Sequence, residues 1–147
     1  MESSHQVDRT EIVRTARRLL RPRVKFRPYG RDPNYGMDCI GVIDWVGKEC
    51  NLLPADLVIP PYAYPPQREA FDLFNEHMNQ VMNPIEGAVV IIADKDGAPR
   101  HTGIVDWADD KWKCIGVDVN GHRPWVTMTP LEIEMVWRFY DFRLAQS

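Results

Sequence analysis

From residue 87 onward the chain consists of short apolar runs separated by turn signals, and this pattern constrains the fold more than any other feature. The run GAVVIIA (87–93) is continuously apolar, and the following DKDG has the residues of a tight turn. Such turns join neighbouring strands in antiparallel hairpins. Further strands are predicted for HTGIVDW (101–107), WKCIGVDV (112–119), WVTM (125–128) and residues 136–142. The second half therefore predicts an antiparallel sheet.

The first half has helical rather than strand periodicity. Apolar residues recur at helical spacing after Asp8 and Glu11, which occupy capping-box positions. Helices are predicted for residues 8–20, 39–48 and 67–82, with loops at 26–37 and at IPPYAYPP (59–66). Helices followed by an antiparallel sheet define the α+β class. We therefore expect one domain over residues 1–147, with N-terminal helices packed on a C-terminal antiparallel sheet.

Charge and apolar patterning exclude several classes of protein. Lys and Arg number 18 against 21 Asp and Glu, so the net charge of −3 argues against a dedicated nucleic-acid binder. The local arginine cluster at residues 14–23 is interpreted as a solvated helix face. The N-terminal segment lacks the pattern of a signal peptide, and no apolar run predicts membrane insertion.

Cys39 is the most informative of the three cysteines. None of them lies in a CxxC motif, and at least one must be a free thiol; Cys50 and Cys114 are interpreted as small buried apolar residues. Cys39 follows Gly36-Met37-Asp38 at the start of the second predicted helix. The unpaired N–H groups and the positive end of the helix macrodipole both favour a thiolate there.

A cysteine nucleophile needs an imidazole base, and His101 is the best candidate. His5 lies near the terminus, His77 in a predicted amphipathic helix, and His122 beside an Asn-Gly turn. His101 instead begins a predicted strand directly after a hairpin turn. Gly103 leaves space on the same face of that strand, because alternate residues share a face.

The segments around Cys39 and His101 resemble those of the NlpC-type cell-wall cysteine peptidases. YGMDCIGVIDWV matches the Gly-x-Asp-Cys-Ser-Gly pattern of the nucleophile segment, with Ile40 in place of the usual serine. HTGIVDW matches the His-x-Gly-Ile segment, and NPIEGAVVII is similar to the strand before it, with Ala88 where Asp is usual. PYG (28–30) is similar to the segment upstream of the cysteine. The resemblance covers roughly residues 28–142.

This resemblance implies a papain-like NlpC-type fold and a cysteine endopeptidase acting on bacterial peptidoglycan. The family commonly cleaves between D-glutamate and a diamino acid. Cys39 would attack the carbonyl to form an acyl-enzyme, and His101 would hold and return the proton. Tyr29, Asp38 and Tyr62 would contribute to substrate binding. No metal or organic cofactor is implied.

PPY at residues 60–62 is similar to the branch of the family found in phage tails and gene-transfer particles. Together with the absence of a signal peptide, this predicts assembly in the host cytoplasm and a final location at the tail tip of a virion. Phage tail-tip proteins would then be partners, in addition to peptidoglycan.

The group that orients His101 is expected on the strand that follows it. No histidine occupies the position of the family's third catalytic residue. Alternation on WKCIGVDVNG places Asp118 and Asn120 on the face shared with Gly116, while Ile115 and Val117 point to the core. Asp118 is the first choice, because a carboxylate fixes the imidazole tautomer and stabilises imidazolium. Asn120 is the runner-up, and the Asn120-Gly121 pair is equally explained as a turn.

Two other classes of function remain open from the sequence. One is a structural or assembly protein of a phage tail that keeps the peptidase fold with weak or no turnover; Tyr62, Tyr64 and Trp125 would then form an interface. The other is a metal-dependent hydrolase using His101, Cys114 and His122. The spacing from Cys114 to His122 fits none of the compact zinc patterns.

Overall fold

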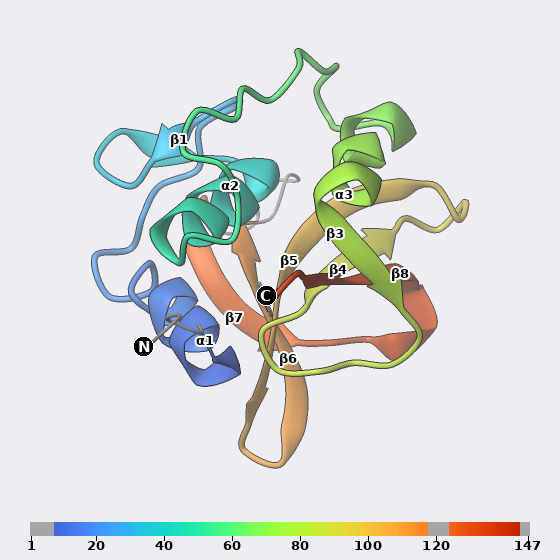
Figure 1. Ribbon diagram of the computed structural model, residues 1–147. Helices are drawn as coiled ribbons and strands as arrows, with labels where there is room; N and C mark the ends of the chain where they lie inside the picture. The colour runs from blue at the N-terminus through green and yellow to red at the C-terminus, as the bar shows by residue number, and fades with distance from the viewer. Residues whose placement is uncertain (1–7, 118–123, 145–147) are drawn as a thin grey trace.

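The computed structural model describes residues 8–117 and 124–144, and Figure 1 shows their arrangement. The helices within these residues are α1 (Arg9–Arg17), α2 (Cys39–Glu49) and α3 (Asp72–His77), with 3-10 turns at Arg68–Phe71 and Ile133–Met135. The strands are β1 (Arg31–Asp32), β2 (Gly36–Met37), β3 (Met78–Val81), β4 (Val89–Ala93), β5 (Pro99–Ala108), β6 (Lys111–Val117), β7 (Val126–Pro130) and β8 (Val136–Phe142).

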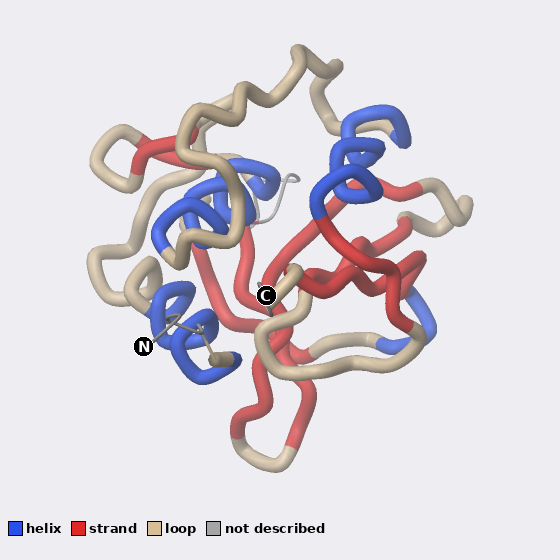
Figure 2. Tube along the Cα trace, viewed as in Figure 1, coloured by secondary structure: helices blue, strands red, loops and turns tan. Residues whose placement is uncertain are grey.

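The main sheet has the strand order β3-β8-β4-β5-β6-β7, and all its pairs are antiparallel (Figure 2). Strands β4 to β7 form the predicted meander. The β5–β6 hairpin is closed by Asp109 and Asp110, both with positive φ, which is the conformation of a tight hairpin turn. The last strand, β8, does not extend the meander at β7 but returns to lie between β4 and β3. The predicted α+β class is confirmed.

Both faces of the sheet are buried, and this explains the continuous apolar run in β4. Val89 and Ile91 pack with α1 and α2 in the larger core, whereas Val90 belongs to a smaller cluster with Val105 and Cys114. A strand covered on both faces needs apolar residues at every position rather than at alternate ones. The helix α2 contacts β5 and β6, and so lies across the middle of the sheet.

The first two helices begin where their caps predict. Asp8 is the N-cap of α1 and accepts a hydrogen bond of 2.8 Å from the backbone N–H of Glu11. Ile12, Val13 and Ala16 are buried, so α1 packs its apolar stripe as expected. Helix α2 begins at Cys39 and ends one residue beyond the predicted boundary.

The third predicted helix is wrong in its second half. Residues 68–77 are helical, but Met78–Val81 form the edge strand β3, paired with β8 from Met78 opposite Phe142. Phe74 in the helix and Met78 in the strand are both buried, so burial of apolar residues alone does not show where the helix ends. The pairing with β8 satisfies the backbone groups of the segment, and this long-range contact decides the conformation.

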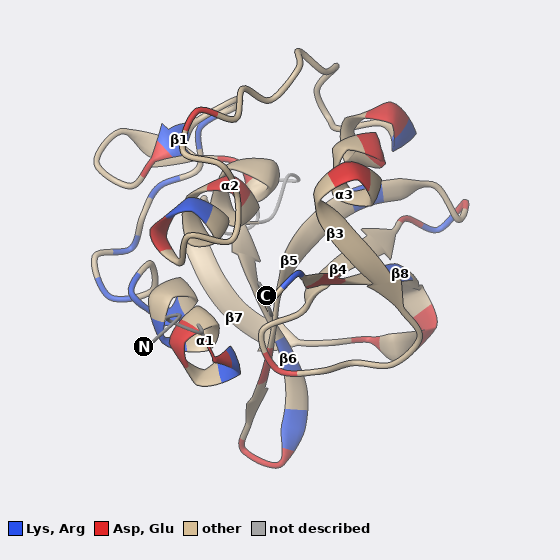
Figure 3. Ribbon diagram, viewed as in Figure 1, with Lys and Arg blue, Asp and Glu red and all other residues tan. Residues whose placement is uncertain are grey.

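The arginine cluster lies on an exposed face, as predicted. Figure 3 shows basic residues on α1 and the loop after it, and acidic residues on and around α3. Three of these arginines also contact other side chains. Arg17 donates two hydrogen bonds, of 2.8 and 2.9 Å, to the buried carboxylate of Asp106. Arg18 pairs with Glu49 at 3.6 Å, and the Arg23 guanidinium lies over the Trp125 ring. Among the described helices, none combines the length and the apolar composition needed to cross a bilayer.

Candidate active site

The site is built on the N-terminus of α2, where Asp38 is the N-cap and Cys39 is the first helical residue. The carboxylate of Asp38 accepts a hydrogen bond of 2.7 Å from the backbone N–H of Gly41. This bond satisfies one of the donors left unpaired in the first helical turn. Both Asp38 and Cys39 are completely buried, so the predicted nucleophile lies at a capped helix start beneath the surface.

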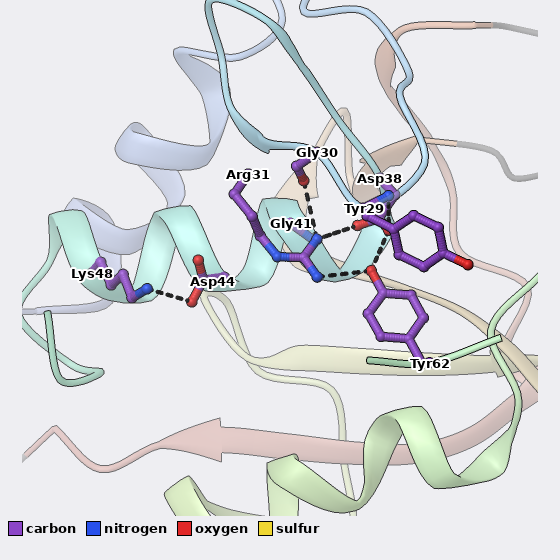
Figure 4. Close-up of polar contacts among 8 residues, drawn as sticks. All are labelled: Tyr29, Gly30, Arg31, Asp38, Gly41, Asp44, Lys48 and Tyr62. Carbon is purple, nitrogen blue, oxygen red and sulfur yellow. Dashed lines mark hydrogen bonds and ion pairs between the residues drawn. The ribbon is translucent and has the colours of Figure 1, made fainter. Parts of the chain in front are cut away.

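Asp38 is the centre of a polar network that includes all three predicted substrate-binding residues. Its Oδ2 accepts hydrogen bonds from the backbone N–H of Tyr29, at 2.9 Å, and from the hydroxyl of Tyr62. Its Oδ1 also accepts a hydrogen bond of 3.0 Å from Arg31, whose other terminal nitrogen donates to the Tyr62 oxygen at 2.9 Å (Figure 4). The Asp38 carboxylate is therefore fully occupied by groups of the protein itself.

The glycines around Cys39 are required by close backbone approach. A Cβ added to Gly41 would lie 2.0 Å from the carbonyl oxygen of Gly30, and one added to Gly30 would lie 2.1 Å from that of Gly36. Gly36 also has a φ of +116°, which disfavours a side chain. The glycines of GMDCIG thus let the loop that carries Tyr29 and Arg31 pack directly on α2.

The preference for a thiolate that the helix start predicts is outweighed by burial. Desolvation, followed by the nearby charge of Asp38, raises the pKa of the Cys39 thiol to about 12. Hydrogen bonds from the backbone of Thr102, Ile40 and Cys39 itself favour the thiolate but are weaker influences. Burial therefore favours the neutral thiol of Cys39.

Cys39 lies near the predicted base, because α2 packs on β5, the strand that carries His101. Thr102 directly follows His101 on β5, so the sulfur lies beside the strand segment that carries the imidazole. A Cβ added to Gly116 would lie 3.3 Å from Cε1 and 3.4 Å from Nε2 of the His101 ring. Gly116 on β6 therefore provides the space beside His101. The space predicted beside Gly103 is filled by Cys114, whose sulfur would lie 2.3 Å from an added Cβ.

Gly116→Ala is therefore expected to displace the His101 ring. If His101 is the base that the sequence predicts, kcat should fall about 10–100-fold, because small misplacements of a reacting group are costly. A Cβ at this position would also lie 3.0 Å from the Thr102 carbonyl oxygen, so a moderate loss of stability should accompany the effect. Steady-state kinetics together with thermal unfolding check the prediction. An unchanged kcat in a folded variant would show that His101 does not need this space.

The residues proposed to orient His101 lie outside the described part of the chain. Asp118 and Asn120 fall within residues 118–123, and so does His122 of the metal-hydrolase alternative. The described residues contain no group of three His, Cys, Asp or Glu side chains arranged to bind a metal ion. The choice between Asp118 and Asn120 remains a prediction from the sequence.

A pocket beside the site involves residues that sequence reasoning missed. It has a volume of about 630 Å³ and is lined by Tyr29, Arg31 and Tyr62 at one end, and by Asp44 and Lys48 further along α2. Lys48 pairs with Asp44 at 3.1 Å (Figure 4). It also donates a hydrogen bond of 2.8 Å to the Leu57 carbonyl. Lys48 follows Asp44 by four residues, so both lie on one helix face. This spacing in the sequence is sufficient to predict the ion pair. The contacts of Arg31 join loops far apart in the chain, so no local pattern predicts them.

The comparisons with known proteins give a match in structure. No protein-family model and no curated protein matches the sequence. A solved structure with a similar fold is the crystal structure of the NlpC/p60 domain of the peptidoglycan hydrolase SagA. It is 17% identical, with a TM-score of 0.56, and the match covers 92% of this chain and 98% of that chain. The α+β arrangement of this protein is therefore the papain-like fold of an NlpC/p60 domain, as the segments around Cys39 and His101 predict.

Proposed function

We propose that the protein is a cysteine endopeptidase that cleaves peptide bonds of bacterial peptidoglycan. The observation that carries the proposal is the position of Cys39, which begins α2 where this helix packs on β5, the strand that carries His101. A nucleophile at a helix start beside a strand histidine is the arrangement needed for acyl transfer. The fold shared with the domain of a peptidoglycan hydrolase supports the choice of substrate.

The reaction would start from a neutral thiol. As Sγ of Cys39 bonds to the carbonyl carbon, the thiol proton passes to His101 and the carbonyl electron pair moves onto oxygen. The backbone N–H of Cys39 at the helix start would stabilise this oxyanion. The tetrahedral intermediate then collapses, the amine leaves with the proton from His101, and water hydrolyses the thioester.

Digestion of purified peptidoglycan tests the proposal. Incubation with the protein should release peptide fragments, and mass spectrometry of these fragments identifies the bond that is cut. A bond between D-glutamate and a diamino acid is the expected site of cleavage. Intact peptidoglycan after prolonged incubation with folded protein, under conditions that preserve the fold, would contradict the proposal.

Carriage by a phage tail tip or a similar particle is the second part of the proposal. It rests on the PPY segment at residues 60–62. The protein should then be present in purified particles, together with tail-tip proteins, and immunogold labelling should locate it at the tail tip. Its isolation from a periplasm after signal cleavage would contradict this part.

A phage-tail structural or assembly protein with little turnover is a second candidate, favoured by the burial of Cys39. Because burial raises the pKa of this thiol to about 12, the neutral thiol predominates at pH 7. Structural cysteines that do not react are also typically buried and neutral. Wall digestion separates the two candidates, since only the peptidase releases peptides.

The burial also predicts how Cys39 reacts with iodoacetamide. The thiolate is the reactive form, so the alkylation rate should be very low at pH 7 and should rise about tenfold per pH unit until the pH approaches 12. Peptide mapping separates Cys39 from the other buried thiols, Cys50 and Cys114. A rate that reaches its plateau below pH 7 would instead indicate a thiolate–imidazolium pair in the resting protein.

A further inference from the structure

A group of aromatic side chains packs on the N-terminus of α2, and Tyr64 belongs to it. The Tyr64 ring lies 5.6 Å from that of Tyr29 and 5.7 Å from that of Phe26, measured between centroids. Tyr29 in turn contacts Tyr62 at 5.1 Å. Since the backbone of Tyr29 and the hydroxyl of Tyr62 both bind Asp38, this group is held next to Cys39.

The hydroxyl of Tyr64 differs from that of its neighbour Tyr62. The Tyr62 hydroxyl bonds to both Asp38 and Arg31, whereas the Tyr64 hydroxyl is buried and has no hydrogen-bond partner among the described residues. A buried donor without a partner is costly, and such groups in native structures call for an explanation. A donor kept for a group that forms only during the reaction is one such explanation.

We propose that the hydroxyl of Tyr64 is an oxyanion donor, which bonds to the negative oxygen formed when Cys39 attacks a carbonyl group. The inference rests on the proposed role of Cys39 as nucleophile and adds a side-chain donor to its backbone N–H. Burial of the phenol is what gives this donor its value, because hydrogen bonds to a developing charge are strongest where water is excluded.

The titration of Tyr64 agrees with a donor role. Burial raises the pKa of the phenol, and the negative charge of Asp38, together with that of Cys39 once it is ionised, raises this pKa further. The hydroxyl therefore keeps its proton over the whole range in which the protein would work, and remains able to donate.

Two reagents that react with the same thiol separate this role from a packing role. 4-Nitrophenyl acetate acylates Cys39: the Sγ–C bond forms, the carbonyl pair moves to oxygen, and the thiol proton passes to His101. The carbonyl then re-forms as 4-nitrophenolate leaves. Iodoacetamide alkylates the thiolate by displacing iodide, and no oxyanion forms. Only the first reaction should need Tyr64.

Tyr64→Phe should therefore slow acylation by 4-nitrophenyl acetate about 10²–10³-fold, while alkylation by iodoacetamide at the same pH stays unchanged. Its melting temperature should be unchanged or higher, because a buried unpaired hydroxyl is removed. Tyr35→Phe is the matched control, since Tyr35 is 74% exposed, and it should behave as the wild type in both reactions. Cys39→Ala sets the background of both reactions.

Three outcomes would overturn the inference: equal acylation of Tyr64→Phe and wild type, parallel slowing of both reactions, and a wild-type protein that is alkylated but not acylated. Parallel slowing would mean that Tyr64 acts on the thiol rather than on the oxyanion. Wall digestion is scored separately. If acylation depends on Tyr64 but the wall is not cleaved, the proposed substrate is contradicted and the donor role of Tyr64 is supported. If the wall is cleaved and Tyr64→Phe cleaves it as fast as the wild type, the substrate is supported and the donor role is contradicted.

Discussion

Replacing Cys39 by alanine is expected to abolish peptidoglycan hydrolysis, with a fall in rate of at least about 10⁴-fold, because no other group can form the acyl-enzyme. The side chain is completely buried in the main core, so loss of the sulfur should cost only about 1 kcal/mol of unfolding free energy. Release of wall peptides and thermal unfolding measure the two effects on the same preparation.

Cys50→Ala is the matched control for this experiment. Cys50 is also a free cysteine, 2% exposed, and it lies at the opposite end of α2 from Cys39. Its replacement should cost similar stability and leave hydrolysis intact. Hydrolysis retained by Cys39→Ala would refute the nucleophile assignment. A loss of stability much larger than in Cys50→Ala would favour a purely structural role for Cys39.

The largest loss of stability is expected from Asp38→Ala. This carboxylate caps α2 and accepts hydrogen bonds from Arg31 and from the Tyr62 hydroxyl. Its removal leaves the Arg31 guanidinium and two backbone N–H groups without their partner, which should cost about 3–5 kcal/mol. For a chain of this length the melting temperature should fall by about 10 °C, which calorimetry can measure.

Two further variants serve as controls for Asp38→Ala. Asp56→Ala removes an exposed carboxylate and should leave the melting temperature unchanged. Tyr62→Phe removes a single hydroxyl from the network and should cost less than Asp38→Ala, since the Arg31 pair and the helix cap remain. If Asp38→Ala were no less stable than Tyr62→Phe, the network would not be what holds the loops against α2.

Local patterns were sufficient for most of the fold. The cap at Asp8, the start of α2 at Cys39 and the bounds of β8 follow from periodicity and turn chemistry, which act within a few residues. The same is true of the placement of Cys39 on a helix and of His101 on a strand, which identified both candidate catalytic residues.

Long-range contacts decided the rest. Met78–Val81 form a strand because β8 pairs with them, although their apolar spacing also suits a helix. The thiol of Cys39 is neutral because loops and strands from distant parts of the chain bury it, and this desolvation outweighs the helix macrodipole that the sequence reveals. The hydrogen bonds from Arg31 and Tyr62 to Asp38 form only once the segments before and after α2 pack on its first turn. The same packing buries the Tyr64 hydroxyl, which has no hydrogen-bond partner in the part of the chain that the structure describes.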